Sequence, residues 1–418
     1  NIVLAGGATQ SGFGRTGTVN WVTTKKTASF TAVSGEGYFC DTAAVGAFTL
    51  TLPSSPSAGN IVGLKDYNGN FGTANLTIGR GGSPINGATA ADVIISTAGA
   101  SIFLVYVDAS QGWVATQDDS STFAGESFIV ASGGTVTTCG NCKIHTFTGP
   151  GTFTVNSVAS GAANNLVSHM VVAGGGGSVN DRGGAGGAGG FREVKSPVTP
   201  YTASPLDGYP SAPNRITVSV QGYPITVGAG GTGDSSPPFT VGGNGLDSVF
   251  SSITSAGGGG GGRNPVSGAN GGSGGGGGSS AGSGNTPPVS PSQGNNGGIA
   301  STTPLVGNGG GGGATAVGAN GSGCTAGGGG AGATTSINGT PTAFAGGGGG
   351  GSDGGGLGAG GAGGGGNGGG GPYPGSSIAA QAGTANTGGG GGGANGGGPS
   401  GVATNGGSGI VIIRYKFQ

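Results

Sequence analysis

Residues 257–262 are Gly-Gly-Gly-Gly-Gly-Gly, and rows of this kind decide the fold of the chain. They recur throughout residues 174–409, separated by short, varied, turn-forming segments such as Asn264–Pro265–Val266. The pattern indicates a chain that runs straight, turns and comes back. The other main rows are 174–177, 183–190 with two alanines, 274–278, 309–313, 346–351, 354–371 with interruptions, and 388–393.

Three interpretations compete for this region: disorder, a collagen triple helix, and a packed bundle of polyproline-II-like glycine helices. Collagen needs glycine at every third position, whereas these glycines are contiguous. Disorder is favoured by the composition, 113 glycines and 21 prolines in 418 residues. A solvated tail usually keeps charge, however, and residues 216–413 contain only four charged side chains. These are Asp234, Asp247, Arg263 and Asp353.

A packed bundle of polyproline-II-like helices is possible because glycine has no Cβ. A polyproline-II helix makes no internal hydrogen bonds, so its N–H and C=O groups point outward and need partners when buried. Neighbouring helices supply them only if no side chain holds the backbones apart. The rows therefore predict a domain held together by lateral backbone hydrogen bonds instead of an apolar core.

Length and charge limit the number of domains and the kinds of partner that the protein can have. A chain of 418 residues suggests two to four domains. The net charge is −1 and only 6% of residues are charged, so we expect no nucleic-acid partner and no membrane insertion. The chain begins at Asn1 without a methionine or a signal-like segment, so we expect a longer protein whose N-terminal region is missing here.

The region before the glycine rows predicts β structure. Residues 1–27 resemble a connector or an edge segment. Residues 28–117 predict a small β-sandwich-like module built from short strands rich in Val, Ile, Phe, Thr and Tyr. Turn signals such as Asn68–Gly69–Asn70 separate the strands. The expected strands are 29–34, 38–41, 47–52, 60–66, 75–78, 92–96, 101–108 and 113–116.

A second β region frames the glycine rows. Residues 126–173 predict the base of the C-terminal domain, after a polar linker at 117–125, and further strands are expected at 191–194, 215–220, 224–227 and 248–254. Residues 410–418 predict a closing strand that pairs near Val167–Val172. A glycine region (174–409) pinned at both ends loses less entropy on ordering than a free tail. The predicted fold is all-β: sandwich-like modules, then a polyglycine-II bundle closed by a C-terminal strand.

The four cysteines include one close pair, Cys139 and Cys142, separated by Gly140–Asn141. This spacing predicts a β-hairpin with a two-residue turn, whose flanking cysteines could form a local disulfide. The alternative is a zinc site with His145, but no fourth ligand or second pair is visible. We therefore expect no metal and no cofactor. No P-loop, nucleophile elbow or paired carboxylates stand out, so we expect no enzyme.

Several segments resemble the glycine-rich distal proteins of tailed-bacteriophage fibres, and the β module resembles those of phage-fibre shafts. The resemblance covers most of the chain from about residue 28. It rests on Thr146–Phe147–Thr148–Gly149–Pro150–Gly151–Thr152–Phe153–Thr154–Val155, His169–Met170–Val171–Val172–Ala173, Phe191–Arg192–Glu193, Tyr223–Pro224–Ile225–Thr226–Val227 and Gly409–Ile410–Val411–Ile412–Ile413–Arg414–Tyr415, with Thr49–Leu50–Thr51–Leu52–Pro53 and Gln111–Gly112–Trp113–Val114 upstream.

The resemblance implies an extracellular receptor-binding adhesin at the tip of a virion's tail fibre. Its partners would be a bacterial surface glycan or outer-membrane protein and other fibre or baseplate proteins, with the β modules forming a homotrimer. Recognition normally lies on loops of a rigid scaffold, and aromatic rings give large contact areas and stack on sugars. Each ring could instead cap or staple the bundle. The candidates are Tyr201, Tyr209, Phe239, Phe344 and Tyr373.

Two further functions are compatible with so much glycine. A structural glycine-rich extracellular fibre protein would be expected to lack the closing strand and the diverse inserts. An ice-binding protein would favour regular ladders of Thr and Ala over bulky Tyr and Pro inserts. Cell binding and thermal hysteresis, respectively, distinguish these functions from an adhesin.

Overall fold

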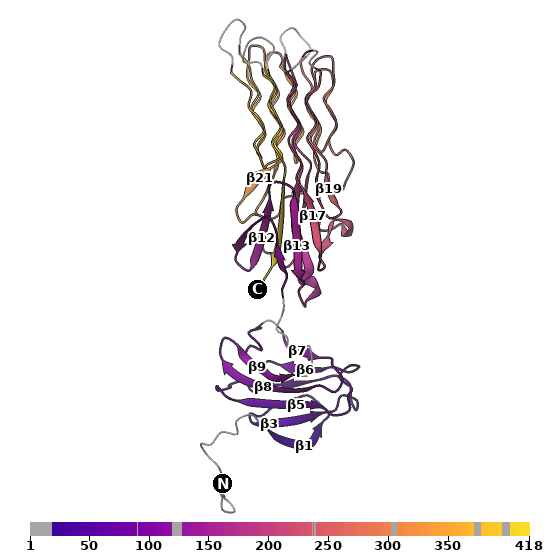
Figure 1. The fold of residues 1–418 in the computed structure, drawn as a ribbon, viewed down its shortest axis with the longest axis vertical. Helices are drawn as coiled ribbons and strands as arrows, with labels where there is room; N and C mark the ends of the chain where they lie inside the picture. The colour runs from indigo at the N-terminus through magenta and orange to yellow at the C-terminus, as the bar shows by residue number, and fades with distance from the viewer. Residues whose placement is uncertain are drawn as a thin grey trace, which may run out of the picture. The chain divides into compact units, whose positions relative to one another are not determined.

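The computed structural model describes residues 19–89, 91–118, 128–235, 237, 240–301, 307–371, 378–394 and 402–418. The described chain is all-β and divides into two compact units, Asn1–Ser127 and Phe128–Gln418. The second unit carries both the glycine rows and the strands at their base (Figure 1). Phe239, Tyr373 and most of the predicted 117–125 linker lie outside the described residues.

The first unit consists of two sheets that face each other across one apolar core. One sheet has the order β1-β3-β5-β8-β9 and the other β2-β4-β6-β7. From β1 to β6 the strands alternate between the sheets and pair in parallel within each, so the chain coils before ending in antiparallel strands. The bounds are β1 Asn20–Lys26, β2 Phe30–Thr31, β3 Glu36–Cys40, β4 Phe48–Thr51, β5 Ile61–Asp66, β6 Leu76–Gly79, β7 Val93–Ile95, β8 Ser101–Asp108 and β9 Gly112–Asp118.

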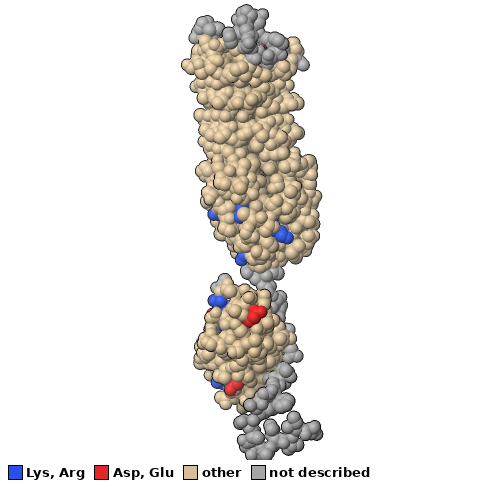
Figure 2. Space-filling model, turned by 90° about the vertical axis from the view of Figure 1, so that its left-hand side faces the viewer, with Lys and Arg blue, Asp and Glu red and all other residues tan. Residues whose placement is uncertain are grey.

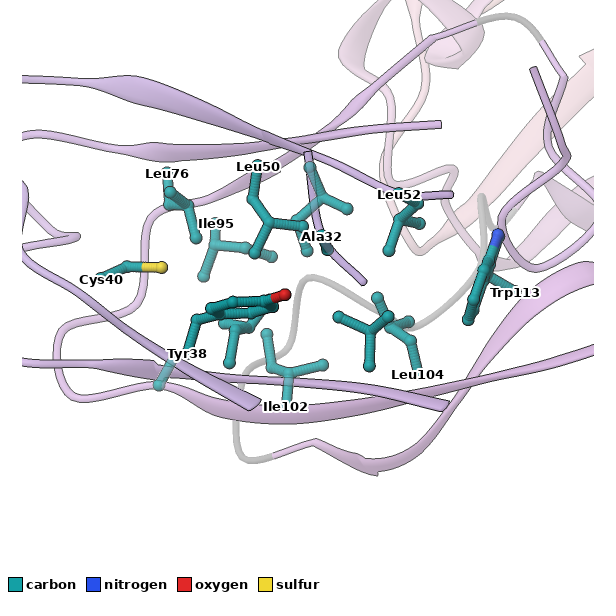
Figure 3. Packing of buried hydrophobic residues seen from close by; sticks show 14 of the residues in the cluster. Ala32, Tyr38, Cys40, Leu50, Leu52, Leu76, Ile95, Ile102, Leu104 and Trp113 are labelled. Atoms are coloured by element: carbon teal, nitrogen blue, oxygen red, sulfur yellow. The ribbon is translucent and has the colours of Figure 1, made fainter. Parts of the chain in front are cut away.

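Alternating side chains build this core. Tyr38, Leu50, Leu104 and Trp113 are almost completely buried between the sheets (Figure 3). All eight predicted strands are confirmed as elements β2–β9, although β2 is only two residues long. Of the two predictions for the N-terminal segment, a connector or an edge segment, the second is confirmed for residues 20–26, which form the parallel edge strand β1.

The base of the second unit also contains two main sheets. Their orders are β10-β13-β17-β18-β19 and β11-β12-β22-β14-β15, with β16 on the edge of β14 and a separate hairpin β20-β21. The bounds are β10 Val130–Ser132, β11 Thr135–Cys139, β12 Cys142–Phe147, β13 Gly151–Ser157, β14 Leu166–Val172, β15 Phe191–Val194, β16 Ile216–Thr217, β17 Gly222–Thr226, β18 Ser248–Phe250, β19 Ile253–Ser255, β20 Ala333–Thr335, β21 Thr342–Phe344 and β22 Ile410–Lys416, with short 3-10 turns at Ala162–Asn165 and Ala212–Asn214.

The C-terminal strand closes the unit as predicted. It lies between β12 and β14, with Val172 opposite Ile410 and Ser168 opposite Arg414. Val411, Ile413 and Tyr415 pack into the core between the two base sheets, whereas Ile410 and Ile412 face a second apolar cluster that includes Ala188 and Phe344. Both faces of β22 are buried, which explains its nearly continuous apolar sequence.

The base differs from its predicted extent. Besides residues 126–173, it includes strands inserted within 174–409, namely β15 to β21. The predicted strand 248–254 is a hairpin, because Ser251 adopts a left-handed conformation (φ 55°) between β18 and β19. The β20-β21 hairpin was not predicted from the sequence.

Glycine rows lie side by side above the base and are joined by backbone hydrogen bonds. The row 183–190 donates to three neighbours: residues 183, 186 and 189 to one, 184, 187 and 190 to a second, and 185 and 188 to a third. Its carbonyls accept from three others. The acceptors of these N–H groups are Ala394, Gly391 and Gly388 in the first neighbour, Gly262, Gly259 and Ala256 in the second, and Gly309 and Gly312 in the third. The three rows that donate to the carbonyls of 183–190 are 173–176, 273–276 and 346–351.

Close backbone approach explains the glycine at these positions. A Cβ added to Gly186 would overlap the carbonyl oxygen of Gly176, and one at Gly311 would overlap that of Gly186. Ala185 and Ala188 are tolerated in the same row and are fully buried. They are three residues apart, the interval at which hydrogen-bond partners repeat along the row.

At the periphery of the rows, asparagine side chains replace missing backbone acceptors. Asn244 Oδ1, for example, accepts the N–H of Gly260 at 2.9 Å. Five other exposed asparagines make the same contact with a neighbouring row, so a side-chain carbonyl takes the place of a backbone carbonyl. They are Asn270, Asn296, Asn320, Asn367 and Asn405.

Replacing Asn244 by alanine is expected to lower the free energy of unfolding of the second unit by about 1 kcal/mol, because the Gly260 N–H loses its acceptor. Asn244→Asp keeps an acceptor oxygen of the same shape and should retain most of that stability. Urea denaturation and the amide exchange rate of Gly260 measure both effects. Equal losses in the two variants would contradict the assigned role.

Candidate functional site

The end of the glycine rows opposite the base gathers several turns that are distant in sequence. Four of the fully described turns are called the far turns: residues 178–183, 263–267, 322–325 and 352–356. They lie next to one another, since Gly183 pairs with Arg263, Arg182 contacts Asp353, and Ser352 donates to the Cys324 carbonyl. Asp234, Gly370 and Ala394, where other connections begin, adjoin the same turns.

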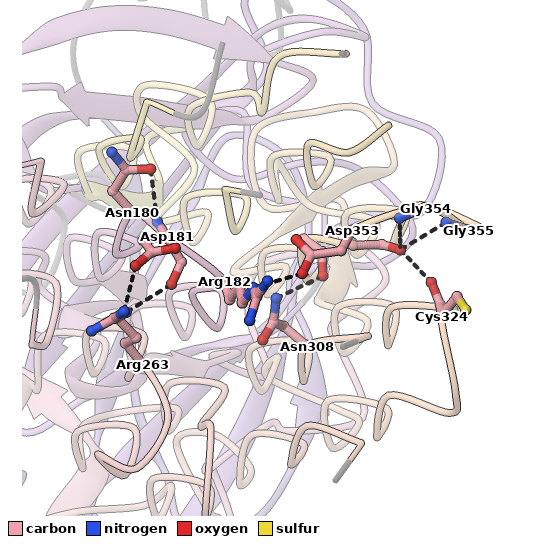
Figure 4. A network of polar contacts seen from close by, with 11 residues as sticks. Asn180, Asp181, Arg182, Arg263, Asn308, Cys324, Asp353, Gly354 and Gly355 are labelled. Carbon is pink, nitrogen blue, oxygen red and sulfur yellow. Dashed lines mark hydrogen bonds and ion pairs between the residues drawn. The ribbon is translucent and has the colours of Figure 1, made fainter. Parts of the chain in front are cut away.

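Ion pairs join the far turns (Figure 4). The Arg263 guanidinium contacts the Asp181 carboxylate and donates from Nε to the Asp181 carbonyl at 2.9 Å. Arg182 Nε lies 2.7 Å from Asp353 Oδ2. Asp181 and Arg182 both adopt positive φ, 56° and 64°, and this sharp turn sends their side chains toward different neighbours.

A buried polar layer supports these pairs. Asn308 is completely buried and its Nδ2 donates to the Gly351 carbonyl at 2.8 Å. The Ser352 hydroxyl donates to the Cys324 carbonyl and accepts the N–H of Gly355. These hydrogen bonds join the far turns 322–325 and 352–356 to each other and to the row that contains Asn308.

An open groove of about 330 Å³ lies beside the far turns, formed by three glycine-rich rows. Leu357 and Ile378 provide apolar walls, and Ile378 is 60% exposed. Between them Asn367 Nδ2 donates to Gln381 Oε1 at 2.9 Å, which leaves an amide pair facing solvent. Apolar walls with a few convergent polar groups are typical of ligand-contact surfaces.

Charge is unevenly distributed over the second unit. On the face in Figure 2, basic side chains lie over the base, and the sides of the glycine rows show neither acidic nor basic residues. Asp181, Arg182, Arg263 and Asp353 place opposite charges at the far turns, where they pair. The far end is therefore a polar surface of little net charge.

Three predicted contact residues lie at the base instead of the far end. The Tyr201 ring packs against Arg414, with 5.1 Å between the guanidinium carbon and the ring centroid, and the Tyr209 ring packs against Arg215 at 4.3 Å. Phe344 is only 3% exposed and belongs to the apolar cluster at the base. These positions match the alternative interpretation, in which the rings staple the fold.

The sequence did not single out the far-turn charges as a site. In the sequence, Arg263 and Asp353 stand out only as two of the few charged residues in the glycine-rich region. Their rarity was the available signal, because a charge retained in such a sequence needs a partner or a role. What the sequence lacked was the direction of each row, which decides the end to which a turn belongs.

The predicted hairpin at Cys139 and Cys142 is confirmed, with the two residues opposite each other across the Gly140–Asn141 turn. Both cysteines are free thiols in this structure, and the possible disulfide between them stays a prediction. Cys139 packs against the cluster that contains Met170, whereas buried Cys142 donates to Asn141 Oδ1 at 3.4 Å. Within the described ranges, no group of three or more His, Cys, Asp or Glu side chains could hold a metal ion.

Glu193 is a buried carboxyl group in the base. It accepts hydrogen bonds from the Thr335 hydroxyl at 2.5 Å and the Ser204 N–H at 2.9 Å. Burial raises the pKa of Glu193 above its ordinary value of 4.5, although both hydrogen bonds oppose this shift. Between the ordinary pKa and the raised pKa, the folded state therefore retains a proton on Glu193 that the unfolded state releases.

This shift predicts that stability contributed by protonated Glu193 is lost as pH rises from about 4.5 through the raised pKa. Glu193→Gln should remove this loss, because the amide can accept from Ser204 and donate to the Thr335 hydroxyl. Urea denaturation of both proteins across this pH range measures the difference. Parallel pH profiles would contradict the prediction.

The second unit, with its closed β base and laterally bonded glycine rows, defines a glycine-rich β protein. The family model for the glycine-rich domain matches residues 146–416, from within β12 to the last residue of β22. The chain belongs to this glycine-rich domain family. No curated protein matches the chain. No described segment is a helix long and apolar enough to cross a membrane.

Proposed function

We propose that the chain is the receptor-binding part of a tailed-phage fibre and that its glycine rows are polyglycine-II helices. The helix assignment is supported by the interval at which hydrogen-bond partners repeat. Gly174 and Gly177 donate to Leu246 and Gly243, whereas Gly175 donates to Gly407. A polyproline-II-type helix has 3 residues per turn, so every third N–H points in the same direction.

The proposed function is non-catalytic attachment of a virion to a bacterium. The rows would act as a rigid spacer and the turns at their far end as the contact surface for a cell-surface glycan or an outer-membrane protein. Loop tips can vary in sequence without disturbing a scaffold held by backbone hydrogen bonds. The first unit would form the trimeric, fibre-proximal part and join other fibre or baseplate proteins.

One observation carries this proposal: turns distant in sequence are held together at the end of the rows farthest from the base. The contacts between Arg263 and Asp181 and between Arg182 and Asp353 fix their arrangement. A preorganised surface costs little entropy on binding. A purely structural glycine-rich protein has no need of such varied turns gathered at one end.

Binding of the full chain to a panel of bacterial strains tests the function. We expect at least one strain to bind the protein, and the double variant R182A/D353A to bind that strain roughly tenfold more weakly. The matched control R80A/D92A removes an ion pair of the first unit and should bind like the parent protein. Absence of binding to every strain, or equal binding by both variants, would overturn the proposal.

A further inference from the structure

The outer face of the β1-β3-β5-β8-β9 sheet carries a cluster of aromatic rings, here called the aromatic patch: Trp21, Phe39, Tyr67 and Phe103. The ring centroids of Trp21 and Phe39 are 4.9 Å apart, those of Trp21 and Phe103 6.0 Å, and those of Phe39 and Tyr67 6.4 Å. Trp21, Phe39 and Phe103 are half-buried, and Tyr67 is 51% exposed. The rings support one another while presenting part of their surface to solvent.

Two glycines in the middle of the sheet make room for this arrangement. Trp21 lies opposite Gly37, which lies opposite Gly63, which in turn lies opposite Phe103. A Cβ added to Gly37 would lie 2.5 Å from Val19 Cγ2 and 2.9 Å from the Trp21 ring, and one at Gly63 2.8 Å from the same Val19 methyl and 3.3 Å from the Phe103 ring. The two glycines thus leave room for buried Val19 and for the rings beside it. The indole can therefore lie low over the sheet and reach the ring of Phe103 two strands beyond Gly37. Glycine inside a strand commonly marks such a close approach.

Hydrogen-bonding groups stand at one end of the patch. Lys25 Nζ lies 5.0 Å from the centroid of Tyr67 and 2.7 Å from Asp41 Oδ2. Asn68 Nδ2 donates to Asp41 Oδ1 at 3.0 Å. Lys25 and Asp41 balance each other's charge, so this end of the patch offers donors and acceptors without a net charge.

We propose that the aromatic patch binds a neutral oligosaccharide. A pyranose ring has an apolar face that packs on an aromatic ring and hydroxyl groups at its edge that need hydrogen-bond partners. Trp21 and Phe39 supply the first kind of contact, and Lys25 and Asn68 supply the second. The rings are already held in place, so little entropy is lost on binding.

The same features argue against a second copy of the chain as the occupant. Lysine is depleted from the cores of protein interfaces, and Lys25 stands over the exposed ring of Tyr67 with its side chain 44% exposed. The inference does not depend on the function proposed for the far turns, which belong to the other unit.

Isothermal titration of the full chain with chitotetraose, cellotetraose and maltotetraose tests the inference. We expect at least one probe to bind at millimolar concentration, and Trp21→Ala and Phe39→Ala each to weaken binding roughly tenfold. Ile94→Ala is the matched control, because Ile94 is 53% exposed on the other sheet and should leave binding unchanged.

Two outcomes would overturn this inference. One is that none of the three probes binds. The other is that Trp21→Ala reduces the sedimentation mass of the protein, which would identify the patch as an interface between copies. The far-turn variant R182A/D353A should bind the probes like the parent protein, so failure here and failure of the attachment function can be told apart.

Discussion

Gly186→Ala is expected to lower the free energy of unfolding of the second unit by about 3 kcal/mol or more, although it adds only one methyl group. Gly186 lies in the row with six hydrogen-bonded neighbours, and its added Cβ would overlap the carbonyl oxygen of Gly176. Neither backbone can move away freely. Gly176 also donates its N–H to Gly187, so a shift that relieves the overlap breaks a hydrogen bond.

The matched control is Gly328→Ala, the same change in another glycine row. A Cβ at Gly328 meets a single atom within 4 Å, the Ala359 carbonyl oxygen at 3.5 Å, which is an ordinary contact. We expect a change of about 0.5 kcal/mol or less, because alanine also loses less backbone entropy than glycine on folding. Calorimetry and urea denaturation of the full chain measure both variants. Similar losses at the two positions would show that close backbone approach does not hold the rows together.

The strands were predictable where side-chain pattern alone decides the structure. Residues 410–417 are strongly β-prone and follow the last glycine row, and the chain can bury them only beside a strand of the base. Their pairing with β14 was therefore predictable from the need to close the glycine region. The strands of the first unit were predictable for a similar reason, since short apolar segments such as 47–52 lie between clear turn signals.

Features that depend on distant partners were not predictable. Residues 20–26 are polar and contain Lys25 and Lys26, so their pattern fits a connector as well as an edge segment, and only pairing with β3 decides for the strand. The β20-β21 hairpin is likewise short and polar, and it forms because Phe344 and Ala333 complete the cluster under the glycine rows. Tertiary packing overrides local propensity in both places.

The candidate surfaces, like the strands, depend partly on local sequence pattern and partly on contacts between distant segments. That recognition would lie on turns between the rows followed from the sequence, but the direction of each row did not. The sequence therefore did not decide between the base and the far end for Tyr201, Tyr209 and Phe344. The aromatic patch left one signal in the sequence: Gly63 lies inside a predicted strand and Gly37 directly before one. The meaning of this signal depends on the register that places both glycines between Trp21 and Phe103.

Ile413→Ala is expected to destabilise the second unit by about 3 kcal/mol, and the loss should extend into the glycine rows. Ile413 is completely buried on β22 and contributes to the core between the base sheets. Its strand pairs with β12 on one side and β14 on the other, and β14 continues directly into the row that begins at Gly174. Loosening β22 therefore releases both ends of the glycine region.

Hydrogen exchange measured at Gly176 and Gly187 distinguishes this coupling from a purely local effect. The glycine rows carry few apolar side chains, and their order depends on holding the chain at fixed ends, which reduces the entropy lost on ordering. Exchange at both amides should therefore accelerate in Ile413→Ala by the factor that corresponds to the loss of global stability. Val136→Ala, at a position 46% exposed on β11, should leave both rates nearly unchanged. If Ile413→Ala destabilises the base strands but leaves these two amides protected, then lateral hydrogen bonds alone hold the rows, and the closing strand anchors only the base.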